Sequence, residues 1–136
     1  NEAGTKGHQV TKFSPDGEFQ MQVVNMSRAA AIYIDTRGTE DLIYIGEYFG
    51  GIASNDVGTN LGPRVTVLKT NGDRVARVGT EAYGSQSGRF YSPHGIAVDS
   101  KGDIYVAEVS HSDYGRGWNL AHEHGELRSL QKLVKV

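Results

Sequence analysis

Two side chains suited to acid–base or metal chemistry stand in one short segment, SPHGIAVDSKGDIYVAEVS, at residues 92–110. His94 precedes one apolar run, and Glu108 stands near the end of a second run beyond a glycine-containing turn. An imidazole can ligate zinc, and a carboxylate can serve as a general acid or base if its surroundings shift its pKa. The same residues could serve the fold alone, because apolar residues that alternate on both sides of a turn indicate a β-hairpin.

A second group of polar and aromatic side chains lies in SHSDYGRGWNLAHEHGELR, at residues 110–128. This segment holds the single tryptophan and three of the five histidines. His122 and His124 share one side only in an extended segment, where they could bind a metal with His111 or His94, although a histidine pair in a polar loop is more often solvated. The catalytic candidates are Tyr114, Arg116 and Glu108, the ligand-binding candidates are Arg64, Trp118 and His111, and the metal candidate is His94.

Charge and composition exclude several classes of function. The chain has 136 residues, which suits one domain, and its 14 basic against 16 acidic side chains disfavour a general affinity for nucleic acid or acidic membranes. The absence of cysteine rules out disulfides and thiolate metal sites. No apolar run approaches the roughly 20 residues that cross a bilayer. The compartment is left open, and an exported protein is compatible with these features.

The chain repeats two kinds of hairpin. Residues 10–23, VTKFSPDGEFQMQV, align without a gap on residues 65–78, VTVLKTNGDRVARV, and each copy reads as two strands joined by an Asp-Gly or Asn-Gly type turn. The closing residues 130–136, LQKLVKV, match the first strand of this outer hairpin. An inner hairpin recurs at residues 32–48 and 96–109, once three extra residues are allowed in the first turn.

The inner hairpins carry acidic residues at equivalent positions. Asp35 and Asp99 end the first strands, where an aspartate can cap the turn by accepting hydrogen bonds from backbone N–H groups. Glu47 and Glu108 stand near the ends of the second strands. Paired carboxylates can perform acid–base work or bind a cation, but a carboxylate that recurs with the repeat is more easily explained by a structural role such as binding a backbone amide.

The alternation of outer and inner hairpins predicts an all-β fold of antiparallel four-stranded blades, the architecture of a β-propeller. A β-sandwich and a small barrel are the alternatives. We expect one partial propeller domain over residues 1–136, made of an outer hairpin at 9–24, a blade at 30–79 and a blade at 93–136. Because this is little more than two blades with open edges, we expect a fragment of a larger propeller or self-association through those edges. The predicted strands are 9–14, 18–24, 30–35, 42–48, 64–69, 74–79, 95–99, 103–109 and 129–135.

The long connections gather at one end of the predicted blades. Segments 49–63, 80–92 and 110–128 all fall there, whereas the short turns fall at the other end. Long irregular loops on a rigid scaffold commonly carry binding residues, although loops rich in glycine and serine can also be plain spacers. His94 begins an innermost strand directly after one of these loops, so we expect its side chain at the mouth of the central channel.

The segment PHGIAVDSKGDIYVAE, in the pattern where it is followed by a V-x-V/K-F/L strand and an Asp-Gly or Asn-Gly turn, resembles NHL repeats, which build six-bladed propellers. Residues 63–136 are similar to the carboxyl-terminal end of bacterial NHL proteins related to the peptidyl-hydroxyglycine lyase. That resemblance implies a zinc ion held by histidines of successive blades, and His94 matches their motif. Ala30 stands at the equivalent position of the other inner hairpin, so the further ligands of a zinc or calcium ion would have to come from elsewhere.

Two functions follow from these patterns. The first is a binding or scaffold module that presents its long loops to a peptide or protein ligand through Tyr, Trp and Arg contacts. The alternative is a metal-dependent lyase or hydrolase with its site at the channel mouth, in which His94 ligates the metal and Tyr114, Arg116 or Glu108 assists. No nucleic acid or membrane partner is expected in either case.

Overall fold

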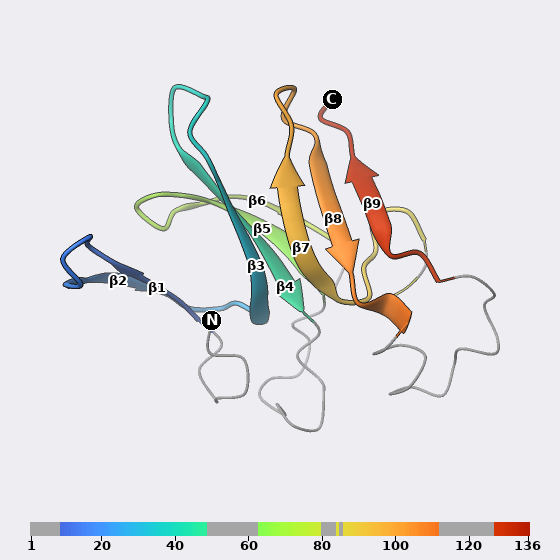
Figure 1. Ribbon diagram of the computed structural model, residues 1–136, viewed down its shortest axis with the longest axis horizontal. Coiled ribbons are helices and arrows are strands. Elements are labelled where there is room, and N and C mark those ends of the chain that lie inside the picture. The colour runs from blue at the N-terminus through green and yellow to red at the C-terminus, as the bar shows by residue number, and fades with distance from the viewer. Residues whose placement is uncertain (1–8, 49–62, 80–83, 85, 112–126) are drawn as a thin grey trace.

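The computed structural model describes residues 9–48, 63–79, 84, 86–111 and 127–136. These residues form three antiparallel sheets in the order β1-β2, β3-β4-β5-β6 and β7-β8-β9 (Figure 1), so the predicted all-β architecture of a partial propeller is confirmed. Among the described segments, no helix has the length and apolar character needed to cross a bilayer. The strands are β1 (Val10–Phe13), β2 (Phe19–Val23), β3 (Arg28–Asp35), β4 (Leu42–Tyr48), β5 (Arg64–Lys69), β6 (Arg74–Val78), β7 (Pro93–Val98), β8 (Ile104–Glu108) and β9 (Leu130–Leu133).

The short turns use the chemistry that the sequence predicts. Gly17 and Gly72 adopt positive φ angles of 87° and 93° in the two outer hairpins, a conformation that favours glycine over any residue with a Cβ. Asp99 accepts hydrogen bonds from the backbone N–H groups of Lys101 and Asp103 at 2.9 and 3.1 Å. Asp35 accepts one from Arg37 N at 3.1 Å, which confirms the predicted turn-capping role of both aspartates.

The core lies between the sheets. One cluster, of Met26, Ala29, Ile45 and Leu68, packs against Val10 and Val23 of the first hairpin. Two further clusters join the second and third sheets, and they include Tyr44, Val67 and Val98 in one and Val65, Phe90 and Val106 in the other. Strand β5 is therefore buried on both faces, because Val65 and Val67 contact the third sheet while Leu68 contacts the first hairpin.

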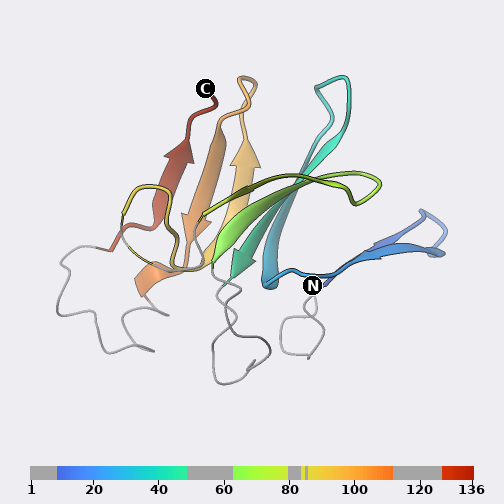
Figure 2. The same cartoon turned by 180° about the vertical axis from the view of Figure 1, so that it is seen from behind.

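The two ends of the sheets differ in what they carry. The β3–β4 and β7–β8 turns lie together at the top of Figure 1, and the last residues of β4 and β8 lie at the opposite end, as the reverse view in Figure 2 also shows. We call this opposite end, where β4 and β8 finish and β3 and β7 begin, the loop end. It is the end from which segments 49–62 and 112–126 depart, and those segments lie outside the described residues.

Candidate binding site at the loop end

Three side chains from neighbouring sheets meet at the loop end. The ring of His94, on β7, approaches the ring of Tyr48, at the end of β4, edge to face with 5.9 Å between centroids. The guanidinium carbon of Arg28, at the start of β3, lies 5.2 Å from the centre of the same tyrosine ring, which is cation–π geometry. We call Arg28, Tyr48 and His94 the loop-end patch.

The His94 side chain faces outward because of a β-bulge. The pairing of β7 with β8 shifts register between Pro93 and Gly95, so His94 is the extra residue of the bulge. Bulges re-aim a side chain and are common next to functional sites. His94 is exposed, and within the described part of the chain its only aromatic contact is with Tyr48. The equivalent register shift in β3 places Ala30 in the same position.

A buried carboxylate fixes the backbone segment that leads into Arg28. Glu47 is fully excluded from solvent, and its Oε2 accepts hydrogen bonds from Ser27 N at 2.5 Å and from Arg64 Nε at 2.9 Å. The Thr66 hydroxyl donates to Oε1 of the same carboxylate. Because Ser27 directly precedes Arg28, the carboxylate holds the segment that brings Arg28 to Tyr48.

The candidate ligand-binding residue Arg64 belongs to this buried network. It is only 4% exposed, and its Nη2 donates to the Asn25 carbonyl at 3.0 Å in addition to its ion pair with Glu47. Arg77 Nη2 donates to the same carbonyl at 3.1 Å. Burial lowers the pKa of Arg77, and the nearby charge of Arg64 lowers it further. The structure thus places Arg64 beneath the loop end, with its guanidinium directed to protein groups.

Glu108 fixes the backbone segment that leads into His94 in the same way. Its Oε2 accepts from the backbone N–H groups of Tyr91 and Ser92 at 2.5 and 3.2 Å, and its Oε1 accepts from Gln131 Nε2 at 2.9 Å. Gln131 stands opposite Val106 in the sheet, as Thr66 stands opposite Ile45. The two glutamates therefore perform one repeated task, which is to tie the segment before an innermost strand to the body of its sheet.

This geometry gives Glu47 and Glu108 a positioning role. Each carboxylate is buried, and each of its oxygens accepts at least one protein hydrogen bond, so the charge is satisfied by fixed donors. Glu47 holds the residue directly before Arg28, and Glu108 holds the residues directly before Pro93 and His94. Sequence reasoning identified the two glutamates as equivalent but did not connect them to the patch, because their donors lie 16 to 23 residues away along the chain.

The described residues do not assemble a metal site. No group of three histidine, cysteine, aspartate or glutamate side chains gathers among them in a way that could hold a metal ion. His94 is an exposed imidazole near the start of β7, and His111 is exposed beyond the end of β8. A zinc or calcium site therefore does not fit the part of the chain that the structure describes. The remaining candidates, Tyr114, Arg116, Trp118, His122 and His124, lie outside the described residues.

A comparison with known families falls on the strands that carry His94 and Glu108. Residues 90–112 match the family model of the NHL repeat. The match spans β7 and β8 and the segment that leads into them, and the all-β, antiparallel sheets are consistent with a partial propeller of NHL repeats. No curated protein matches the chain. An NHL repeat indicates a propeller-type binding or scaffold module, and the similarity to proteins related to peptidyl-hydroxyglycine lyase stays a prediction.

Proposed function

We propose that the chain is a propeller-type binding module that receives a peptide or protein partner at its loop end. The observation that supports this most strongly is the loop-end patch, in which an exposed imidazole and a guanidinium both contact the Tyr48 ring. Tyr and Arg are among the residues that most often carry the energy of protein interfaces. The patch spans two sheets, so a ligand bound there would contact both.

The chemistry of the patch favours a partner with an acidic or aromatic side chain. The Arg28 guanidinium can form paired hydrogen bonds with a carboxylate. The exposed His94 ring offers a second donor and a flat surface for an aromatic side chain. Tyr48 is only 8% exposed, so it serves as the support on which the two outer groups are held.

The support beneath the patch is rigid, which suits recognition. The buried carboxylates of Glu47 and Glu108 fix the backbone immediately before Arg28 and before Pro93. A partner therefore meets side chains whose main chain is already ordered, and it does not have to offset the entropy of ordering them. Segments 49–62 and 112–126 lie outside the described residues, and their part in binding stays a prediction of the sequence.

Peptide selection followed by mapping tests this proposal. Peptides that bind the full chain would be selected from a random-sequence display library, and the best would be titrated into ¹⁵N-labelled protein. We expect the largest amide shifts at Arg28, Tyr48 and His94, and about tenfold weaker binding for Arg28→Ala or His94→Ala, since a contact of about 1.4 kcal/mol is lost. Lys101→Ala, at the opposite end of the sheets, is the matched control and leaves affinity unchanged. Shifts confined to the turns at 36–41 and 99–103 would contradict the proposal.

A further inference from the structure

The two segments that lead into the loop-end patch share a second point of attachment. Asn25 and Arg89 are equivalent, since each stands two residues before an amide that Glu47 or Glu108 binds. The backbone carbonyl of each one accepts two hydrogen bonds from side chains. The side chain between the carbonyl and the amide is buried in the core in both segments. The main chain is therefore held on both sides of a core residue.

In the second sheet, two arginines hold the carbonyl of Asn25. Arg64 Nη2 donates to it at 3.0 Å and Arg77 Nη2 at 3.1 Å. Arg64 also bonds the Glu47 carboxylate, whereas Arg77 directs its Nε to the Thr66 hydroxyl at 3.0 Å. Asn25 adopts a positive φ of 60°, which is uncommon for a residue with a Cβ, so the two donors also stabilise a strained turn.

In the third sheet, a glutamine and an arginine hold the carbonyl of Arg89. Gln131 Nε2 donates to it at 2.7 Å and Arg128 Nη2 at 3.0 Å. Gln131 also bonds the Glu108 carboxylate, whereas Arg128 also donates to the Gln86 carbonyl at 3.3 Å. Each of the two carbonyls thus has one donor that also serves the buried glutamate, and one arginine that also bonds a different group.

The two arginines reach these carbonyls from positions that the sequence repeat does not align. Arg77 lies on β6, whereas Arg128 stands just before β9, which pairs with β8 as β5 pairs with β4. The same attachment is therefore built twice from different strands. Since the geometry recurs although its residues do not, the fixed carbonyl is what the two segments have in common.

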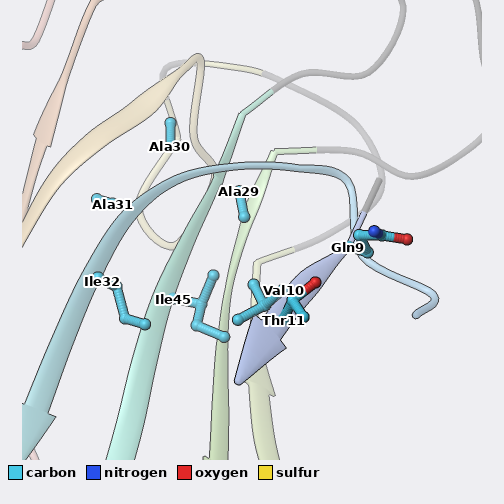
Figure 3. Close-up of a pocket in the computed structure, with 8 residues that line it drawn as sticks. All are labelled: Gln9, Val10, Thr11, Ala29, Ala30, Ala31, Ile32 and Ile45. Atoms are coloured by element: carbon cyan, nitrogen blue, oxygen red, sulfur yellow. The ribbon is translucent and has the colours of Figure 1, made fainter. Parts of the chain in front are cut away.

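The strand that continues from Arg28 offers only small side chains at its start. Ala29, Ala30 and Ala31 all line a pocket of about 200 Å³ between β1 and β3. In Figure 3, Ala29 and Ala30 stand on opposite sides of the β3 ribbon, so neither side has a bulky group here. The hydrogen bonds upstream of Arg28 therefore carry much of its positioning.

We propose that Arg77 and Arg128 are positioning residues of the loop-end patch, each for one half of it. Arg77 holds the segment that presents Arg28, and Arg128 holds the segment that presents His94. Loss of either arginine leaves its carbonyl with one donor, so the segment shifts and its patch residue moves relative to the Tyr48 ring. The consequence for binding rests on the proposed function, whereas the placement of the two groups can be measured without a ligand.

Side-chain NMR of the ligand-free protein tests the placement. The ring current of Tyr48 displaces the resonances of the Arg28 side chain and the His94 ring, and Tyr48→Leu identifies that displacement. We expect Arg77→Met to remove most of the displacement at Arg28 and little of that at His94. Arg128→Met should do the reverse. Arg77→Lys and Arg128→Lys retain a cationic donor, so each should restore part of the displacement that its methionine variant loses.

Binding measurements connect the placement to recognition. With a peptide selected as described above, Arg128→Met should weaken binding by about three- to tenfold in the wild type but by less than about twofold in His94→Ala, since its effect passes through that side chain. Arg77→Met should depend on Arg28 in the same way. Arg74→Met, the matched control, changes an exposed arginine at the start of β6 and should alter neither the resonances nor the affinity.

Two results would overturn the inference. The first is a pair of methionine variants that move both patch groups alike, or neither of them, because the arginines would then not act on separate halves. The second is additive losses of affinity in the double variants, for a peptide whose binding depends on both Arg28 and His94. Peptides that depend on neither side chain would contradict the proposed function instead, and the resonances of the ligand-free protein would still decide the placement.

Discussion

The Glu47 carboxylate and the Arg64 guanidinium form an ion pair inside the protein, with 2.9 Å between Oε2 and Nε and side-chain exposures of 0% and 5%. Neither group can exchange its partner for water. Glu47 also accepts hydrogen bonds from the backbone N–H of Ser27 and from the Thr66 hydroxyl, so three segments of the chain meet at one carboxylate. The network joins β3, β4 and β5 at the end of the sheet where the loop-end patch lies.

Removal of the Glu47 carboxylate should therefore be strongly destabilising. We expect Glu47→Ala to lower the free energy of unfolding by about 3–5 kcal/mol, because it leaves the buried Arg64 charge and the Ser27 amide without their acceptor. Urea denaturation followed by circular dichroism measures the change. The matched control is Glu40→Ala, whose carboxylate forms a surface pair with Lys69 at 3.1 Å and should change stability by less than about 1 kcal/mol. Equal effects of the two substitutions would show that the Glu47 network contributes no special stability.

Glu108 should show its positioning role in local protection as well as in stability. Glu108→Ala leaves the N–H groups of Tyr91 and Ser92 without their buried acceptor, at a cost of about 2–5 kcal/mol for the two. Hydrogen exchange detected by NMR should show these two amides losing protection first. Glu108→Gln retains an acceptor oxygen and should be the milder change. Unaltered exchange at both amides in Glu108→Ala would contradict the assignment.

Much of the fold could be predicted because its information is local and repeated. Alternating apolar residues and Asp-Gly or Asn-Gly type turns located the nine strands to within about two residues. Two boundary differences have one physical cause: β3 and β7 are predicted to begin at residues 30 and 95 but begin at Arg28 and Pro93, because pairing resumes beyond the bulges at Ala30 and His94. A bulge depends on pairing between strands, so a single strand sequence does not reveal it.

The site was only partly predictable, because its contacts join distant segments. His94 and the Glu47–Glu108 equivalence were found from the repeat. The partners of these residues were not, since Tyr48 reaches His94 across two sheets and Thr66 reaches Glu47 from the next strand. Arg64 was expected to meet a ligand because arginine is common at interfaces, and only the packing of Glu47 shows where its charge is directed.

Gly79 should be far less tolerant of a side chain than Gly17. Both adopt positive φ angles, 109° and 87°, so alanine strains the backbone at either position, by about 1–3 kcal/mol. A Cβ at Gly79 would also lie 2.9 Å from Cδ2 of the fully buried Phe90, while a Cβ at Gly17 would meet nothing within 4 Å. We expect Gly79→Ala to cost about 1–3 kcal/mol more than Gly17→Ala in urea denaturation, owing to the overlap in the core. A smaller loss for Gly79→Ala than for Gly17→Ala would argue against the tight packing of Phe90.

Acid should weaken the third sheet through Asp103. A hydrogen bond from Lys132 lowers the pKa of Asp103 below its ordinary value of 3.8, and the Lys135 N–H lowers it further; Lys132 Nζ lies 2.8 Å from Oδ2 and Lys135 N lies 2.9 Å from Oδ1. A carboxyl whose pKa is lower in the folded state binds its proton more tightly when unfolded. Its contribution to stability is therefore complete above pH 3.8 and is lost as the pH falls through the folded value.

The Asp103→Asn variant isolates this effect. We expect its unfolding free energy to decline less steeply than that of the wild type as the pH falls from about 5 to about 2, because the titrating group is gone. Lys132→Met should flatten the profile in the same direction, since it removes the cation that holds the pKa down. Asp16→Asn, in the exposed turn of the first hairpin, is the matched control, and its acid profile should follow that of the wild type. Parallel profiles for wild type and Asp103→Asn would show that β9 is not held to the β7–β8 turn by this carboxylate.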